Sequence, residues 1–484
     1  MNNNKKNRSK GISRSDFLKI GALSTITVGS GLLGRPIQAI PKFKSEGDAK
    51  NVIFLVVDGM SSGTLTLADI LKQRQYGSKT NWIRLYESDK KFHRGLMDMA
   101  SLDSPVTDSA AAASSWGCGH RINNGAVNMG IKGQRYTPVL EIFRRAGKAT
   151  GLVTTARITH ATPAGFCVSA PSRNLEAAIA EQYLARGVDV YMGGGKSHFD
   201  SEKRNDKLDL YDLFGKNGYT IVHNKTELKR ATRNSKLLGL FADSHLPYTV
   251  DHNSIPELKA NIPTLSEMTN AAIQRLEKNP EGFILQVEAG RVDHAAHGND
   301  PAALVYDQLA FDEVIGDVLE YVENKDDTLL IITTDHGNAN PGLNGTGVQY
   351  RDSGRLFDRL QQFRHSNEWI FRELSIDSTL DQIKERIEYA TRLQISNHEA
   401  QMFKDSFEGK LRTPYRALRT PDTVLAQIEA NYIAVNWIGT MHTSDYVELA
   451  AIGPGSEQLK PFVRNTELFN LMVDMAGVRK YAGG

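Results

Sequence analysis

Three acidic side chains stand at the ends of apolar runs and could bind a cation together. Asp58 directly follows Asn51–Val57, Glu288 follows residues 282–287, and Asp335 follows residues 328–334. Apolar runs of this length and composition are typical of buried parallel strands. Because ligands of open α/β sheets bind outside the carboxyl ends of the strands, we expect the three carboxyl groups to lie at one edge of a sheet.

Histidines accompany these acids. Asp293 and His297 follow Glu288 and are four residues apart, so they share one face if their segment is helical. His336 is adjacent to Asp335, and His442 lies in a predicted loop after a later apolar stretch. Carboxylate and imidazole ligands without thiolates suit zinc or a similar ion.

An oxygen-only subset consists of Asp58, Thr162 and Glu288 and suits magnesium. Each residue alone has a simpler interpretation, because an Asp after a strand is usually a turn or cap residue and a loop His is usually solvated. Four such clusters at strand ends favour a metal site instead.

The stretch TDSAAAASS, residues 107–115, predicts a helix that begins at Thr107 or Asp108. The hydroxyl of Ser109 would then lie in the first turn, where free backbone N–H groups favour an anion. An ordinary capped helix with a small-residue face is the alternative interpretation.

The elements that must position these residues belong to an α/β protein. Residues 148–155 and 188–195 predict two further strands, and helical patterns separate the apolar runs. Residues 349–429 are charged and helical in pattern and contain no apolar β run, which indicates an insertion or cap on the sheet.

Composition excludes several classes of protein. The chain has 484 residues, with 58 Lys plus Arg against 56 Asp plus Glu, so it lacks the charge of a nucleic-acid-binding protein. Only Cys118 and Cys167 are present, which excludes a disulfide scaffold and a cysteine-based zinc module. Whether these two cysteines pair is not decided by the sequence.

The first 39 residues differ from the rest and predict an export signal. A basic start precedes the apolar residues 20–34, a segment too short for an ordinary membrane span. Residues 13–19 resemble a twin-arginine signal, but Ser15 stands where the second arginine belongs. The alternative interpretation of these residues is an uncleaved membrane anchor or a disordered tail. Export would place the mature chain in a bacterial periplasm or outside the cell, without a stable membrane span.

The motifs, taken in order from VVDGM at residue 56 to HTSDY at residue 442, resemble those of the alkaline phosphatases. The resemblance implies a central, mostly parallel sheet with helices on both faces. Residues 47–348 and 430–480 would form the catalytic domain, and residues 349–429 a helical insertion.

The resemblance also implies roles for the site residues. Ser109 would be the phosphorylated serine and a metal ligand, and Arg173 in APSRN would clamp the phosphate. One zinc would be held by Asp293, His297 and His442, a second zinc by Asp58, Asp335 and His336, and one magnesium by Thr162, Glu288 and the bridging Asp58. His160 and His294 would lie near this third metal, as in the animal enzymes.

The expected activity is therefore hydrolysis of small phosphate monoesters, with a homodimer as one expected assembly. A phosphodiesterase or sulfatase-like hydrolase on the same metals is the nearest alternative, and a phosphate- or metal-binding protein without turnover is another. Ser444 stands where the family usually has glycine, so substrate range and dimer contacts do not carry over directly.

Overall fold

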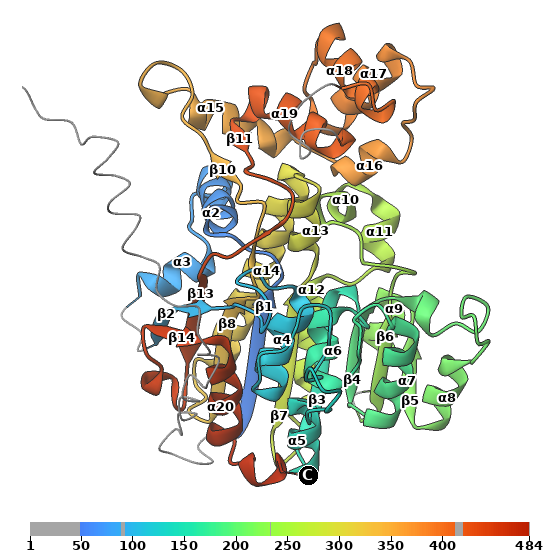
Figure 1. Ribbon diagram of the computed structural model, residues 1–484, viewed down its shortest axis with the longest axis vertical. Helices are drawn as coiled ribbons and strands as arrows, with labels where there is room; N and C mark the ends of the chain where they lie inside the picture. The colour runs from blue at the N-terminus through green and yellow to red at the C-terminus, as the bar shows by residue number, and fades with distance from the viewer. Residues whose placement is uncertain (1–48, 89–91, 233, 412–419, 484) are drawn as a thin grey trace, which may run out of the picture. The chain divides into compact units, whose positions relative to one another are not determined.

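The ten-stranded sheet of this protein brings the predicted strands together in one layer (Figure 1). The computed structural model describes residues 49–88, 92–232, 234–411 and 420–483, and the predicted export signal lies outside them. In sheet order the strands are β14 (Phe462–Arg464), β2 (His93–Asp98), β13 (Val447–Ile452), β8 (Thr328–Thr334), β1 (Asn51–Val57), β7 (Phe283–Ala289), β3 (Ala149–Arg157), β4 (Val190–Gly194), β6 (Lys236–Leu240) and β5 (Tyr219–Val222).

The sheet is mostly parallel, as predicted. Only β13 runs antiparallel to its neighbours β8 and β2, and the described pairs of the other strands are parallel. Both faces of the central strand β1 are buried. Ile53 and Leu55 belong to the core on one face, and Val52 and Phe54 to the core on the other. This double burial explains why the run is continuously apolar rather than alternating.

Helices cover both faces, which confirms the predicted fold class. One face packs against α2 (Ser62–Tyr76), α3 (Asn81–Tyr86), α12 (Leu265–Leu276), α13 (Arg291–His297) and α14 (Pro301–Val322). The other packs against α4 (Ser109–Cys118), α5 (Val139–Arg145), α6 (Ala161–Cys167), α7 (Glu176–Arg186), α8 (Leu210–Lys216) and α20 (Asn465–Met475). Shorter connecting helices are α9 (Lys225–Arg230), α10 (Thr249–Ser254) and α11 (Pro256–Asn261).

Two short β-pairs lie between the sheet and the later helices. They are β9 (Gly337–Asn338) with β12 (His442–Thr443), and β10 (Gly342–Leu343) with β11 (Val435–Asn436). Both pairs join segments about a hundred residues apart in sequence. The first pair brings His442 back beside the end of β8.

The regular secondary structure of the described residues between 349 and 429 is helical, with no strand among them. They form α15 (Ser353–Phe357), α16 (Asn367–Phe371), α17 (Leu380–Thr391), α18 (Asn397–Phe407) and most of α19 (Pro421–Ile433). Helices α16 to α19 share a hydrophobic core of their own. They lie beyond the carboxyl ends of the strands, at the top of Figure 1.

The start of α16 is tied to helices beside the sheet. The hydroxyl of Ser366 donates to Asp251 Oδ2 at 2.5 Å, and the Asn367 amide donates to Asp300 Oδ2 at 2.5 Å. These carboxylates belong to α10 and to the N-cap of α14. The contacts fix one end of the helical segment to the part of the fold that carries Asp293 and His297.

Cys118 and Cys167 are both buried free thiols, which answers the question left by the sequence. Within the part of the chain that the structure covers, no helix combines the length and apolar character needed to cross a membrane.

Candidate metal centre

The three acids predicted at strand ends do lie at one edge of the sheet. Strand β1 lies between β7 and β8, with Val56 opposite Glu288 and Val57 opposite Thr334. Asp58 and Asp335 are the residues that follow β1 and β8, and both are completely buried, as is Glu288. Three carboxyl groups thus meet in the interior, which confirms the prediction from the apolar runs.

Asp58 lies at the centre of this group. Both of its carboxylate oxygens are buried without a hydrogen-bond partner. His336 Nε2 lies 3.5 Å from Asp58 Oδ1 and 3.3 Å from Asp335 Oδ2, and His160 Nδ1 lies 4.0 Å from Asp58 Oδ2. A buried carboxylate without hydrogen-bond partners destabilises a protein. The surroundings of Asp58 therefore favour a bound cation.

The pKa values point the same way. Burial raises the pKa of Asp58 well above its usual range, and the carboxylates of Asp335, Asp293 and Glu288 raise it further. Burial also raises the pKa of Asp335, and it raises that of Glu288 to about 7. Burial lowers the pKa of His336, so this ring is neutral. Neutral imidazole and clustered carboxylates are suited to divalent cations, which relieve the repulsion between the acids.

A second group forms where α13 meets β12. Asp293 and His297 share one face of α13, as their spacing predicted, with Asp293 Oδ2 3.4 Å from His297 Nε2. His442 Nε2 lies 3.5 Å from Asp293 Oδ1 and 3.0 Å from His297 Nε2. The chain thus brings together two residues of a helix and one residue from far along the sequence.

The two imidazoles of this group are oriented as metal ligands. His297 Nδ1 lies 2.6 Å from the Thr440 carbonyl oxygen, and His442 Nδ1 lies 2.9 Å from that of Thr107. A carbonyl oxygen only accepts, so each ring carries a proton on Nδ1. The two Nε2 atoms are thus the ring nitrogens that face each other, 3.0 Å apart, and they are the atoms available to bind a cation.

Ser109 lies in the first turn of α4, as the sequence predicted, although the helix begins at Ser109 itself rather than at Thr107 or Asp108. Asp108 is the N-cap, and its Oδ1 accepts from the Ala111 amide at 2.9 Å. The Ser109 side chain is buried, with Oγ 3.3 Å from His336 Nε2. The hydroxyl is therefore held at a helix N-terminus beside the Asp58 group, where a negative group is favoured.

Arg173 approaches the same place from the loop after α6. Its Nη1 donates to Asp108 Oδ2 at 3.1 Å, and its Nη2 donates to His160 Nε2 at 3.0 Å. The guanidinium thus lies beside the residue that precedes Ser109. It brings a fixed positive charge to a site otherwise rich in carboxylates.

Thr162 is fully buried in α6, two residues after His160. His294 lies on α13, and its ring centroid is 5.6 Å from that of His160. His294 thus contacts His160, which in turn faces Asp58 with its Nδ1 4.0 Å from Asp58 Oδ2.

Sequence reasoning missed two side chains of this region. His245 packs its ring 4.1 Å from that of His294, and Thr154 Oγ1 donates to Glu288 Oε2 at 2.5 Å. His245 is a single histidine in a loop, and no spacing pattern distinguishes it. Thr154 lies inside a predicted strand. Its hydroxyl near the carboxyl end of that strand was the one feature of the sequence that could have placed it beside the site.

Three sets of side chains can each hold a metal ion. Their ligand atoms lie within 4.8 Å of one another in the sets Asp293, His297 and His442; Asp58, Asp293 and His336; and Asp58, His160 and Glu288. The first set is the one predicted. The other two share Asp58: one contains Asp293 where Asp335 was expected, and the other joins His160 to the expected Asp58 and Glu288.

Small residues allow the helices beneath this site to approach closely. All ten residues of α4 are buried. A Cβ atom built on Gly117 would lie 1.9 Å from the Gly165 carbonyl oxygen, and one built on Gly165 would lie 2.6 Å from the Ala113 Cβ. The small-residue face that seemed a competing interpretation is present as well, and it packs α4 against the helix that carries Thr162.

We therefore expect Gly117→Ala to destabilise the protein by about 2 kcal/mol or more, because the added methyl group meets backbone that cannot rotate away. Calorimetry should show a lower unfolding temperature. Gly215→Ala is the matched control: Gly215 lies in α8, and its Cβ would meet only one atom, 4.0 Å away. That variant should be unchanged or up to about 1 kcal/mol more stable. Equal effects of both changes would contradict the packing argument.

Comparison with known proteins connects this geometry to a family. Residues 49–478 match the sequence profile of the alkaline phosphatase family. Alkaline phosphatase 4 of Bacillus subtilis is 30% identical over 477 residues, which cover 95% of this chain and 96% of that protein. Escherichia coli alkaline phosphatase is 30% identical over 349 residues, 64% of this chain and 74% of that protein. The crystal structure of Thermus thermophilus alkaline phosphatase superposes with a TM-score of 0.86 at 35% identity and covers 93% of this chain and 96% of that chain.

Proposed function

Since the chain belongs to the alkaline phosphatase family and is a phosphomonoesterase, we propose that it hydrolyses a broad range of phosphate monoesters through a phosphoserine formed on Ser109. The observation that supports this most directly is the position of the Ser109 hydroxyl. It lies at the N-terminus of α4, 3.3 Å from His336 Nε2 and beside the buried Asp58 group.

We assign two zinc ions and one magnesium ion to the centre. Asp293, His297 and His442 would hold one zinc; Asp58, Asp335, His336 and Ser109 the other; and Asp58, Thr162 and Glu288 the magnesium. When bound, these cations supply Lewis acidity and offset the negative charge of the phosphoryl group. The unpartnered oxygens of Asp58 and the facing imidazole nitrogens of His297 and His442 support the assignment.

The proposed reaction has two steps, the formation of a phosphoserine and its hydrolysis. As Ser109 Oγ bonds to phosphorus, the bond from phosphorus to the alcohol oxygen breaks and the alcohol leaves. Water hydrolyses the phosphoserine, which regenerates the serine and releases inorganic phosphate. Arg173 would grip two phosphoryl oxygens with its planar guanidinium, and Asp108 holds that group in place through its 3.1 Å contact.

We place His160 and His294 beside the third metal rather than on it. Because Arg173 donates to His160 Nε2, the neutral ring of His160 carries its proton on Nδ1, which faces Asp58. In this tautomer Nδ1 has no free lone pair for a metal. His294 Nδ1 likewise accepts from Arg291 Nη1, at 3.1 Å.

The nearest alternative is a phosphodiesterase on the same scaffold. Arg173 favours a monoester, because a diester presents one fewer charged oxygen to the guanidinium. The test is hydrolysis of an aryl phosphate monoester beside the matched diester, with the purified protein loaded with zinc and magnesium. We expect preferred monoester turnover that disappears after chelation and returns when the metals are restored. Preference for the diester, or turnover that survives complete removal of metal, would refute the proposal.

We also propose that residues 1–39 direct export to the periplasm or the cell exterior. N-terminal sequencing of the exported protein would test this.

We further propose that residues 349–429 form a cap on the catalytic domain of residues 47–348 and 430–480. Deletion of the cap, followed by an assay of the remaining domain, would test this.

Finally, we propose that the chain dimerises, which sedimentation equilibrium would test.

A further inference from the structure

Arg291 is a buried cation that has no part in the reaction proposed above. It is the first residue of α13, two positions before Asp293, and its side chain is 6% exposed. A buried guanidinium keeps its charge, so it destabilises a protein unless nearby groups compensate for that charge. The partners of Arg291 should therefore show why the charge is there.

Three groups surround this guanidinium. Nη2 donates to Glu368 Oε2 at 2.6 Å, and Nη1 donates to His294 Nδ1 at 3.1 Å. The Tyr248 ring lies against its face, with 3.7 Å between the guanidinium carbon and the ring centroid. Arg291 thus connects a carboxylate of the helical segment to an imidazole beside the metal centre.

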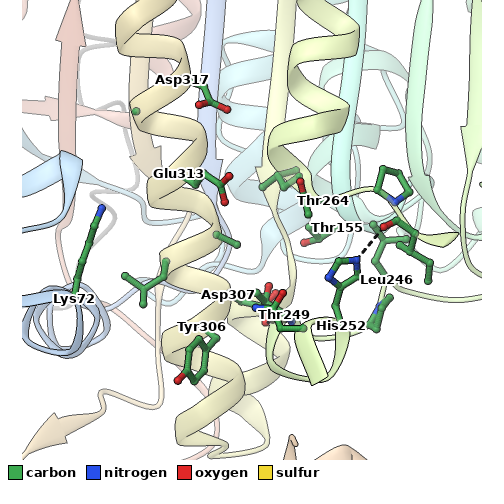
Figure 2. Close-up of a pocket in the computed structure, with 18 of the residues that line it drawn as sticks. Lys72, Thr155, Leu246, Thr249, His252, Thr264, Tyr306, Asp307, Glu313 and Asp317 are labelled. Carbon is green, nitrogen blue, oxygen red and sulfur yellow. Dashed lines mark hydrogen bonds between the residues drawn. The ribbon is translucent and has the colours of Figure 1, made fainter. Parts of the chain in front are cut away.

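The Tyr248 ring is itself held by the core of the fold. Tyr248 is buried, and the amide of the next residue, Thr249, donates to Asp307 Oδ2 at 2.9 Å. Figure 2 shows Thr249 beside Asp307 of α14, in the wall of a cavity between α10, α12 and α14. The aromatic face therefore fixes the plane of the Arg291 guanidinium, and the hydrogen bond to Glu368 fixes its rotation within that plane.

Glu368 is held in place from within the helical segment. The two residues before it are bonded to α10 and to the N-cap of α14, as described above. Arg372, one turn later on α16, donates to the other carboxylate oxygen of Glu368 at 2.6 Å. The Glu368 side chain, 43% exposed, thus reaches from the surface to the buried Arg291.

On the inner side of Arg291, the contacts continue to the arginine assigned to phosphate. The His294 ring packs against that of His160, with their centroids 5.6 Å apart and their planes at 72°. His160 Nε2 accepts from Arg173 Nη2 at 3.0 Å, and Asp108 accepts from the other end of that guanidinium. The orientation of Arg173 therefore depends on His160, and that of His160 on the ring packed against it.

We propose that Glu368 is a positioning residue for phosphate: through Arg291 and the two histidines, it keeps Arg173 in the orientation that binds the phosphoryl oxygens. The inference rests on the function proposed above, because it takes Arg173 as the phosphate-binding residue. It also gives the helical segment of residues 349–429 a role in substrate binding, since Glu368 belongs to that segment.

Equilibrium dialysis of the metal-loaded protein against labelled inorganic phosphate tests the proposal. We expect Glu368→Gln to bind phosphate about three- to tenfold more weakly than the wild type. Removal of a negative charge near an anion site would by itself strengthen binding, so weaker binding identifies the loss of positioning. Partial unfolding of the variant would lower the number of binding sites without changing their dissociation constant. Metal analysis of the same samples should show the wild-type content.

Arg372→Gln is the matched control, because Arg372 pairs with the same carboxylate on its exposed side, and its own side chain is 54% exposed. This variant should bind phosphate within about twofold of the wild type. Arg291→Lys tests the route, because one ammonium group cannot reproduce the two directed contacts of the guanidinium. It should also weaken phosphate binding, and addition of Glu368→Gln to it should cause no further loss.

Unchanged or stronger phosphate binding in Glu368→Gln would overturn the proposal. So would an equal loss in Arg372→Gln, a loss of bound metal from Glu368→Gln, or additive losses in the double variant. A failure of the proposed function would be distinct, because the wild type itself would then neither hydrolyse monoesters nor bind phosphate.

Discussion

Ser109→Ala should reduce kcat/KM for an aryl phosphate monoester by about 10³-fold or more, because the covalent step loses its nucleophile. The hydroxyl at the start of α4 is buried beside His336, and no other hydroxyl occupies that first-turn position. The residual activity would come from direct attack of water on the phosphorus atom, assisted by the metals and by Arg173. Steady-state kinetics of the purified variant measures the loss.

Two measurements separate loss of the nucleophile from damage to the site. The metal content of Ser109→Ala should match that of the wild type, and phosphate should no longer become covalently attached to the protein after acid quenching. Ser115→Ala is the matched control: Ser115 lies buried in the same helix, and its hydroxyl donates to the Ala112 carbonyl at 2.6 Å. Full activity in Ser109→Ala would assign the reaction to another nucleophile, and an equal loss in Ser115→Ala would mean that damage to the helix lowers the activity.

Local sequence patterns predicted the part of the site that depends on single elements. Asp58 and Asp335 could be placed because each follows an apolar run that is typical of a buried strand. The i to i+4 spacing of Asp293 and His297 predicted their shared face on α13. Ser109 could be placed because its neighbours form a strong N-cap signal. In each case the information lies within a few residues of the functional group.

The contacts between distant segments could not be derived in this way. His442 reaches Asp293 because β12 pairs with β9, with His442 opposite Asn338, and this pairing joins residues more than a hundred positions apart. The carbonyl oxygens of Thr107 and Thr440, which orient the imidazoles of His442 and His297, are backbone atoms without a sequence signature. The sequence offered His442 as a candidate ligand and the family resemblance grouped it with Asp293 and His297, whereas only the structure shows what orients it.

The fold itself was predictable where strands are buried on both faces, since such strands are continuously apolar. Strand β2 (His93–Asp98) escaped prediction, because it is partly exposed and contains charged residues. It pairs with β13 and β14 near the edge of the sheet, where burial no longer dictates composition. The strands around Asp58 are buried on both faces and therefore continuously apolar, which is why they located the site in the sequence.

Asp58→Asn should have the second large effect, with opposite consequences for activity and for the metal-free protein. Asp58 belongs to two of the three sets that can hold a metal, so its loss should remove metal from both. We expect activity to fall by about 10³-fold, since charge stabilisation by bound cations supplies much of the rate. Metal analysis after dialysis and kinetic assay measure these losses.

The metal-free variant should, by contrast, be more stable than the metal-free wild type. Burial and the carboxylates of Asp335, Asp293 and Glu288 oppose ionisation of Asp58, so a neutral amide of the same shape removes an unfavourable charge. Thermal unfolding of both apoproteins tests this, with Asp212→Asn on the exposed surface of α8 as the control. An Asp58→Asn apoprotein that unfolds at a lower temperature than the wild type would mean that Asp58 has a structural partner. Retention of all metals would mean that the shared carboxylate is not a ligand, and the two-zinc arrangement proposed above would then be wrong.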